Sequence, residues 1–174
     1  MHLYLKQNDL VISNQLKSKL LYKHVFESEK LKTVRLNINL NKLKSFNEDI
    51  ILESLFLLEF LTSLKSYISF YKRMYQEVHV QLSNTLRSPH FFYFFTILKM
   101  FYFPILNRRN LVLADSFDKS FNYTLKLNSV NTFPFVPDIY FKWNLPINCF
   151  IIFNSQNKAQ SKLFLHYFNF PINN

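Results

Sequence analysis

The chain has 174 residues and none of them is glycine. Glycine is the residue that most easily adopts positive φ in a tight turn, so other side chains must build every such turn here. In SFDKSFNYTLKLN, residues 116–128, Asp118-Lys119 stands where a hairpin turn commonly has Asp-Gly. We expect this turn to bend through the Asp118 carboxylate, bonded to the backbone that follows it. The lack of glycine also excludes a glycine-rich phosphate-binding loop.

Composition narrows the class of protein. Hydrophobic residues make up 49% of the chain, which is enough for one domain with a sizeable core. The formal net charge of +10 predicts a polyanionic partner, either nucleic acid or an anionic membrane surface. The single cysteine excludes an intrachain disulfide.

The favoured residues point to the type of genome. Phe, Tyr, Ile, Asn, Lys and Leu have codons rich in A and T, whereas Gly is absent and Ala occurs only at 114 and 159. This bias indicates an A/T-rich genome such as many organelles carry; an A/T-rich bacterium or parasite nucleus is the alternative. The N-terminal MHLYLKQNDL is neither a secretory signal nor an Arg/Ser-rich import signal. That fits an organelle-encoded mitochondrial protein, and it fits a cytosolic protein equally well.

Two periodicities alternate along the chain. Residues 10–27, 45–65, 88–103 and 155–168 have helical features, including a Ser45/Glu48 capping box and a Ser88-Pro89 helix start. Apolar residues cover more than half of the turns of the helix at 45–65, so we expect it to be largely buried. Residues 32–41, 78–87 and 121–128 alternate with period two, and we expect Tyr123 to pack beneath the sheet against the helix at 88–103. Residues 147–153 form a buried apolar strand, and 67–77 are a short strand or an aromatic-basic loop. We therefore predict an α+β fold, a mainly antiparallel sheet with helices on one face. It is a single domain, 1–174, with an N-terminal helical segment at 1–30 and a core at 31–172.

No motif for catalysis or metal binding is found. The five histidines have no ligand spacing, and Asp115 and Asp118 are typical turn formers. Cys149 lies in an apolar strand and is expected to be a small core residue. We expect no enzyme activity, no cofactor, no metal and no small-molecule substrate.

One segment raises the alternative of a membrane protein. HFFYFFTILKMFYFPIL, residues 90–106, is strongly apolar, but Lys99 interrupts it and Pro104 ends it. A membrane span needs about 20 mostly apolar residues, so a buried core helix is favoured. The alternative function is a small membrane-associated organelle protein.

The outward positions of the three alternating strands carry amides, hydroxyls and cations but no acid. They are Thr33, Arg35, Asn37, Asn39, Asn41, His79, Gln81, Ser83, Thr85, Arg87, Asn122, Thr124, Lys126 and Asn128. Such donor-rich residues suit phosphates, 2′-hydroxyls and base edges, and a broad sheet suits folded RNA. The alternative is a merely solvated face, since acids are scarce and Asn is inflated by codon bias.

Two further basic segments add candidates. Tyr71 and Tyr75 flank Lys72 and Arg73, and they either stack on bases or pack in the core. The pair Arg108-Arg109 is expected in a loop, either solvated or touching phosphate. The full set of RNA-binding candidates is Arg35, Asn37, Asn39, Lys42, Lys44, Lys72, Arg73, His79, Gln81, Arg87, Arg108, Arg109, Lys119, Asn122 and Lys126.

Several short motifs occur in an order that resembles a known family. Thr85-Leu86-Arg87 precedes the Phe-rich helix; Ser116, Phe117, Asp118, Asn122 and Tyr123 match a Ser-Phe-Asp-Gly-x-Gly-Asn-Tyr turn, with Lys119 and Phe121 in place of its glycines. Phe133-Pro134 and then Asn169-Phe170-Pro171 follow, and Leu36-Asn37-Ile38 fits more loosely. Over residues 30–172 the chain resembles the large-subunit ribosomal protein numbered five in the bacterial scheme, which binds 5S rRNA in the central protuberance.

The resemblance implies a structural role in translation. It implies a sheet docked on large-subunit rRNA, with 5S rRNA as partner where the ribosome has one, and neighbouring proteins of the central protuberance. It also implies that the loop near residues 66–77 approaches peptidyl-site transfer RNA, and that a further contact reaches the small-subunit head. We therefore expect a constituent of the mitochondrial large ribosomal subunit.

Overall fold

The computed structural model describes residues 11, 14, 18, 31–40, 48–72, 78–108, 116–128, 133, 145–154 and 157–170. The elements are β1 (Leu31–Asn39), α2 (Glu48–Thr62), β2 (Tyr67–Lys72), β3 (Val78–Leu86), α3 (His90–Ile97), the π-helical segment η2 (Leu98–Tyr102), α4 (Phe103–Arg108), β4 (Tyr123–Leu127), β5 (Ile147–Phe153) and α5 (Lys158–Tyr167). Residues 11, 14 and 18 are helical and exposed; the rest of the helix expected at 10–27, and the expected cap residue Ser45, lie outside the described residues.

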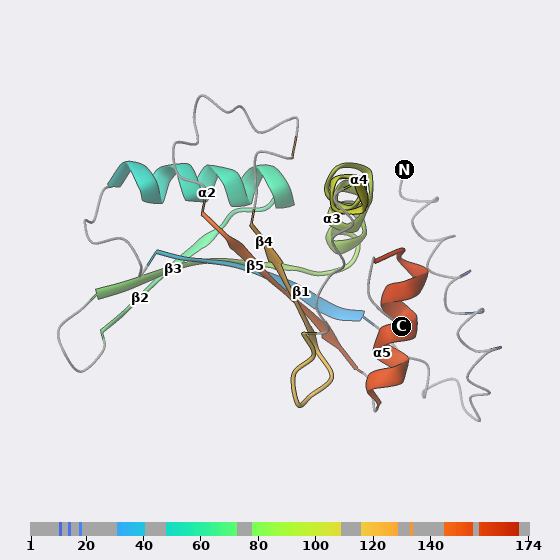
Figure 1. Cartoon of the computed structure of the whole chain (residues 1–174). Coiled ribbons are helices and arrows are strands. Elements are labelled where there is room, and N and C mark those ends of the chain that lie inside the picture. The colour runs from blue at the N-terminus through green and yellow to red at the C-terminus, as the bar shows by residue number, and fades with distance from the viewer. Residues whose placement is uncertain are drawn as a thin grey trace.

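The five strands form one antiparallel sheet in the order β2-β3-β1-β5-β4. Helix α2 and the stretch from α3 to α4 lie against one face of this sheet, and α5 lies at its end (Figure 1). None of these described helices covers the opposite face. The predicted α+β fold, with a mainly antiparallel sheet and helices on one face, is confirmed.

Alternation along the strands places the core between the sheet and these helices. Val34, Leu36 and Ile38 of β1 are buried, as predicted, and so are the alternate residues of β3 and β4. Strand β5 alternates too: Ile147, Cys149, Ile151 and Phe153 are buried, and the residues between them are half-buried. The strand expected to be apolar on both sides thus has one face in the core, because helices cover only one side of the sheet. Burial raises the pKa of the Cys149 thiol well above its usual range.

The Phe-rich segment is longer and begins differently than expected. The Ser88–Pro89 peptide bond is cis, and Pro89, not Ser88, occupies the N-cap position without a side-chain cap bond. The Arg87 carbonyl accepts hydrogen bonds from the N–H groups of His90 (2.8 Å) and Phe91 (3.4 Å), and this takes the place of the cap. The helical path does not stop near residue 103. Pro104 lies in the first turn of α4, after the π-helical segment η2, and proline is tolerated in a first turn because its missing N–H is not needed there.

Aromatic rings join α3, α4, α5 and the sheet. The Phe170 ring contacts the rings of Phe95, Phe103 and Tyr123, with centroid separations of 5.5, 4.7 and 6.4 Å. The Tyr102 hydroxyl donates to the Lys126 carbonyl of β4 at 3.4 Å, and burial raises the pKa of the Tyr102 phenol. Tyr123 therefore packs beneath the sheet near the Phe-rich segment, as predicted. No helix among the described residues is long and apolar enough to cross a membrane.

Without glycine, other residues adopt positive φ. Among the described residues these are Ser63, Phe121 and Asn169, with φ of 55°, 61° and 58°. After α5, the Phe170 N–H bonds to the Leu165 carbonyl (3.1 Å) and the Asn169 N–H to the His166 carbonyl (2.9 Å). This is a Schellman motif with Asn at the position where glycine is most frequent. At the end of α5 the chain thus keeps the usual helix-end geometry without a glycine.

A buried amide fastens the end of α2 to β3. The Asn84 Nδ2 group donates to Thr62 Oγ1 at 2.7 Å and to the Leu64 carbonyl at 3.0 Å, and Asn84 is almost fully buried. Thr62 Oγ1 in turn donates to the Leu58 carbonyl at 2.7 Å. These bonds connect the last residue of α2 and the loop that follows it to β3. The position of α2 over the sheet is therefore set by polar bonds as well as by apolar packing.

Candidate nucleic-acid interface

The face of the sheet opposite α2 is called the outer sheet face here. The strand register brings its side chains into lateral rows, because residues paired across strands point to the same side. One row crosses all five strands: Tyr67, Ser83, Asn37, Asn148 and Lys126. Every member has an amide, hydroxyl or ammonium group, and Tyr67 adds an exposed ring at the edge of the sheet.

Two shorter rows flank this one. The first is Thr85, Arg35, Phe150 and Thr124, and the second is Ser69, Gln81 and Asn39. The outer sheet face is therefore mostly polar but not uniformly so, because β5 contributes Phe150 and, farther along, Ile152. Both are half-buried, and they were not expected here because the strand was predicted to be wholly in the core. An aromatic ring among cations and amides is compatible with base stacking.

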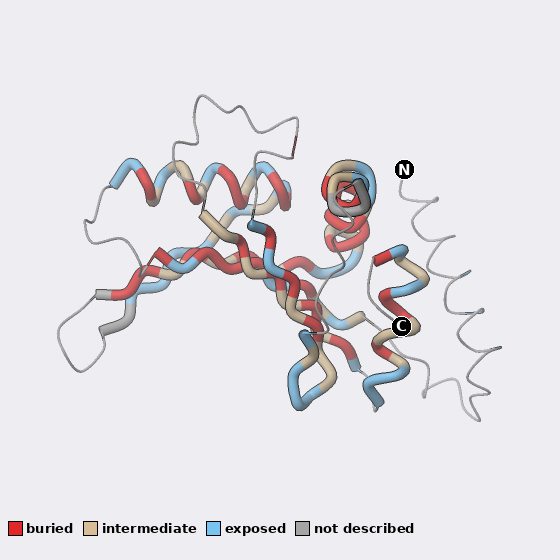
Figure 2. The backbone as a smooth tube through the Cα atoms, viewed as in Figure 1, coloured by how far each residue is buried: buried red, intermediate tan, exposed pale blue. Residues whose placement is uncertain are grey.

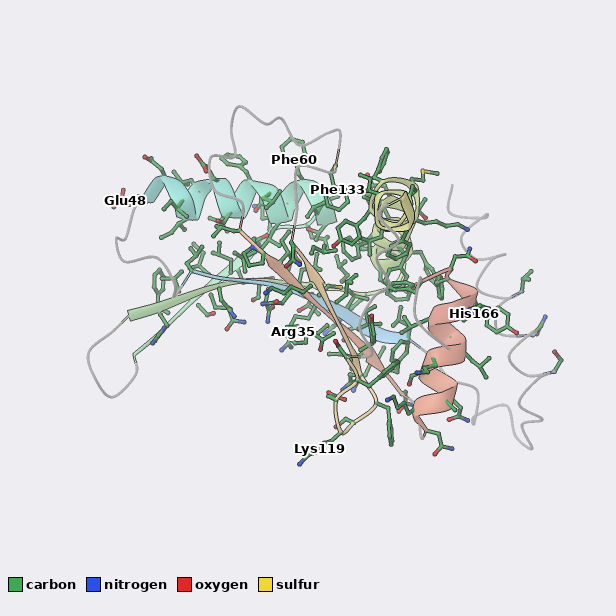
Figure 3. All side chains as sticks on the ribbon, in the orientation of Figure 1. Arg35, Glu48, Phe60, Lys119, Phe133 and His166 are labelled. Carbon is green, nitrogen blue, oxygen red and sulfur yellow. The ribbon has the colours of Figure 1, made fainter. Side chains whose placement is uncertain are left out.

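The cations of this face are available for contact. Arg35 lies on the central strand β1 and projects from the side of the sheet opposite α2 (Figure 3). Arg35, Lys126 and Arg87 are exposed. Neither Arg35 nor Lys126 forms an ion pair with a described residue. Their charges are thus free to meet an external anion.

Acids are distributed very unevenly over the described part of the chain. Four of them lie on α2, on the far side of the sheet, and the fifth is Asp118 in the turn before β4. The described positions of the outer sheet face contain none. Among the described residues, the Asp118 turn is therefore the one place where an anionic ligand on the outer sheet face could meet a carboxylate.

The turn before β4 is built by Asp118, as predicted. Its Oδ1 accepts from the N–H groups of Ser120 (2.9 Å) and Asn122 (2.7 Å), and its Oδ2 accepts from Asn122 Nδ2 at 2.9 Å. The carboxylate is thus occupied by the turn itself. Lys119 is exposed at the tip and points away from the sheet (Figure 3).

Three predicted contact residues are less available than expected. Asn37 and His79 are each only 8% exposed, since both lie between neighbouring strands on the outer face. Asn37 Oδ1 is buried and has no hydrogen-bond partner in the described part of the chain. The Asn122 amide is engaged inside the fold, because its Oδ1 accepts from the Phe153 N–H at 3.2 Å while its Nδ2 donates to Asp118. Asn122 therefore has a structural role.

The remaining RNA-binding candidates lie in different parts of the chain, and only some of them are on the outer sheet face. Asn39 is exposed beside the half-buried Gln81, and both lie on the outer sheet face. Arg108 belongs to α4 and not to a loop, because the helix continues beyond Pro104. The side chains of Lys72 and Arg108 lie outside the described part of the chain, as do the residues Lys42, Lys44, Arg73 and Arg109.

The structure also shows residues that sequence reasoning missed. Tyr67 joins the central row from the edge strand, and only the register of β2 on β3 reveals this. Phe150 and Ile152 belong to the same face for a similar reason. No group of three or more His, Cys, Asp or Glu residues that could hold a metal ion occurs among the described residues.

Comparison of the sequence with models of protein families and with curated proteins gives no match. The function of the protein is therefore inferred from its own residues, from their geometry and from the resemblance of its motifs.

Proposed function

We propose that this protein is a structural, RNA-binding constituent of the large ribosomal subunit of a mitochondrion. The outer sheet face is its main contact with ribosomal RNA. The observation that carries the proposal is the contrast between this face, with its free Arg35 and Lys126 and no described acid, and the acidic helix on the other side of the sheet. Electrostatic docking needs such a face, because each cation that meets a phosphate releases counterions.

Two further features support the ribosomal assignment. The fold is of the kind that the resemblance implies, an antiparallel sheet with helices on one face. Phe121 has φ of 61° at the place where the resembling turn motif has its second glycine. A bulky residue at positive φ is uncommon, so the backbone keeps a conformation that glycine favours even though the glycine is gone. In this proposal 5S rRNA, proteins of the central protuberance, peptidyl-site transfer RNA and the small-subunit head are the further partners.

A charge-matched comparison tests the RNA contact. The double variant Arg35→Gln/Lys126→Gln removes two exposed cations from the outer sheet face. The control Lys65→Gln/Lys99→Gln removes two exposed cations from outside it, so the net charge is the same. Binding to large-subunit rRNA from the same genome is measured by filter retention over a range of salt concentrations.

We expect the first variant to bind more weakly than the wild type. The slope of log K against log salt concentration should become shallower by about 0.7–0.9 for each contact removed, while the control keeps the slope of the wild type. Equal losses in both variants would show that binding follows net charge and not this face. The cellular side of the proposal is tested by a mass-spectrometric inventory of purified organelle ribosomes. Absence of this chain from intact large subunits would contradict the assignment.

A further inference from the structure

Helix α2 has an apolar stripe on the side that faces away from the sheet. Ile50, Leu57, Leu58 and Leu61 point into the core and are buried. Leu52, Phe56 and Phe60 follow one another at intervals of four residues and are 53%, 58% and 53% exposed. Residues at this spacing lie on one side of a helix. Exposed residues line the upper side of α2 in Figure 2, and Figure 3 shows Phe60 pointing away from the sheet. A helix expected to be largely buried is thus buried on one side only.

This stripe is bordered by acids. Glu48 and Asp49 lie one turn before Leu52, while Glu53 and Glu59 lie three residues on either side of Phe56. No Lys or Arg occurs anywhere in α2. The net charge of the whole protein is +10, but the charge of this helix is negative.

One carboxylate oxygen of these acids has no hydrogen-bond partner among the described residues. Glu59 Oε1 accepts from the Ser66 N–H at 3.2 Å, so the end of the loop before β2 already uses it. Glu53 Oε2 is buried and has no hydrogen-bond partner within the described residues. A carboxylate oxygen withdrawn from water without a donor costs free energy, and a cation placed beside the same carboxylate would offset part of that cost.

The charges decide between the possible occupants of the stripe. RNA and an anionic bilayer would both be repelled by the four carboxylates. A second copy of this chain, docked through the same surface, would bring carboxylates against carboxylates. An amphipathic helix with Lys or Arg beside its apolar residues satisfies both the apolar stripe and the acids. Clustered exposed apolar side chains on a soluble protein commonly mark such a site.

We propose that the outward side of α2 is a docking site for a basic amphipathic helix of another protein. Leu52, Phe56 and Phe60 form the apolar contact, and Glu53 with the acids of the first turn pairs with the cations of the partner. This site is independent of the proposed RNA contact, because the two surfaces lie on opposite sides of the sheet (Figure 1). The protein then joins an RNA on one side to a basic protein on the other.

Synthetic peptides test the site on the full-length protein. The first probe is a fluorescent amphipathic helix with a Leu stripe flanked by Lys, and the second has the same Leu stripe flanked by Glu. The variant Leu52→Ser/Phe56→Ser removes the apolar contact, and Glu48→Gln/Glu53→Gln removes two carboxylates. Phe70→Ser is the matched control, because Phe70 is an exposed apolar residue on β2 and not on α2. Binding is measured by fluorescence anisotropy, with circular dichroism to verify the fold of each variant.

We expect the Lys-flanked peptide to bind and the Glu-flanked peptide not to bind. The Leu52/Phe56 variant should weaken binding roughly tenfold or more, as loss of central apolar contacts usually does. The Glu48/Glu53 variant should weaken binding and reduce its salt dependence, and Phe70→Ser should change neither.

Four results would overturn the proposal: equal binding of the two peptides, an equal effect of Phe70→Ser, loss of RNA affinity in the Leu52/Phe56 variant, or a dimer in sedimentation that this variant abolishes. The last result would assign the stripe to a second copy of the chain. Failure of the outer sheet face to bind RNA would leave these outcomes unchanged, so the two proposals fail separately.

Discussion

The outer sheet face and the outward side of α2 lie on opposite sides of one sheet and differ in chemistry. The sheet face has rows of amides and hydroxyls with Arg35 and Lys126 and no described acid. The helix side has large apolar residues bordered by carboxylates and no cation. Both are surfaces of the folded chain, and the hydrophobic core separates them.

This comparison shows that the net charge of a chain does not say where on the folded protein the charges lie. A value of +10 taken alone predicts a polyanionic partner for the whole molecule. Because α2 holds four of the five described acids, the excess of positive charge is concentrated elsewhere, including on the outer sheet face. One fold thus presents two surfaces suited to partners of opposite charge.

The largest expected effect tests whether the outer sheet face is separate from the core. Tyr123 and Lys126 lie on the same strand and point to opposite sides of it. Tyr123→Ala should lower the free energy of unfolding by about 3–5 kcal/mol, because it empties a large aromatic site in the core. Lys126→Ala should change stability by less than about 0.5 kcal/mol and yet weaken RNA binding. Urea unfolding and RNA titration measure the two effects, and the reverse pattern would show the strand faces to be wrongly assigned.

A smaller effect concerns what holds α2 in place. Asn84→Ala should cost about 1–3 kcal/mol in unfolding free energy, because the Leu64 carbonyl and the Thr62 hydroxyl lose a buried donor. Ser83→Ala, at the neighbouring outward position, serves as the control and should cost less than about 0.5 kcal/mol. Chemical denaturation compares the two variants. If they unfolded alike, apolar packing alone would be enough to position the helix.

The turn before β4 should respond to the return of a glycine. Phe121→Gly should be about 1 kcal/mol more stable than Phe121→Ala, because only the first variant relieves the positive φ of 61°. Both variants lack the ring, so their difference isolates the backbone. Thermal unfolding followed by circular dichroism provides the measurement. Equal stabilities would show that the backbone at this position carries no strain.

The smallest expected effect is on the apolar stripe of α2. Phe56→Ser should change the free energy of unfolding by less than about 0.5 kcal/mol, since Phe56 is more than half exposed. Leu58→Ala, at a fully buried position in the same helix, should cost about 2–5 kcal/mol. A large loss in Phe56→Ser would place the stripe in the core of the folded chain, contrary to the structure. Denaturant unfolding of the two variants distinguishes these cases.

Much of the fold could be predicted because strand periodicity is a local property. Val34, Leu36 and Ile38 alternate with polar residues, and the structure buries them as a set. The Asp118 turn was predictable for a similar reason, since a carboxylate can bond to backbone groups only a few residues away. In both cases the interacting groups lie close together in the sequence.

The features that could not be predicted from the sequence depend on contacts between residues far apart in the chain. Asn84 occupies an inward position and is tolerated there only because Thr62 and Leu64 of the α2 end supply its acceptors. Phe150 joins the outer face because no described helix covers β5 on that side. The continuation of the helix beyond Pro104 depends on a π-helical segment that no propensity marks.

The sequence by itself determined the strand alternation, the glycine-free turn and the lack of acids on the outward strand positions, because each follows from residues adjacent in the chain. The tertiary structure decided which faces are covered. It turned one side of the apolar helix α2 outward, withdrew Asn37 and His79 from solvent, and engaged Asn122 within the fold. The physical reason is that burial is set by whatever packs against a residue. That depends on the order of the strands and the placement of the helices, and not on the residue's immediate neighbours in sequence.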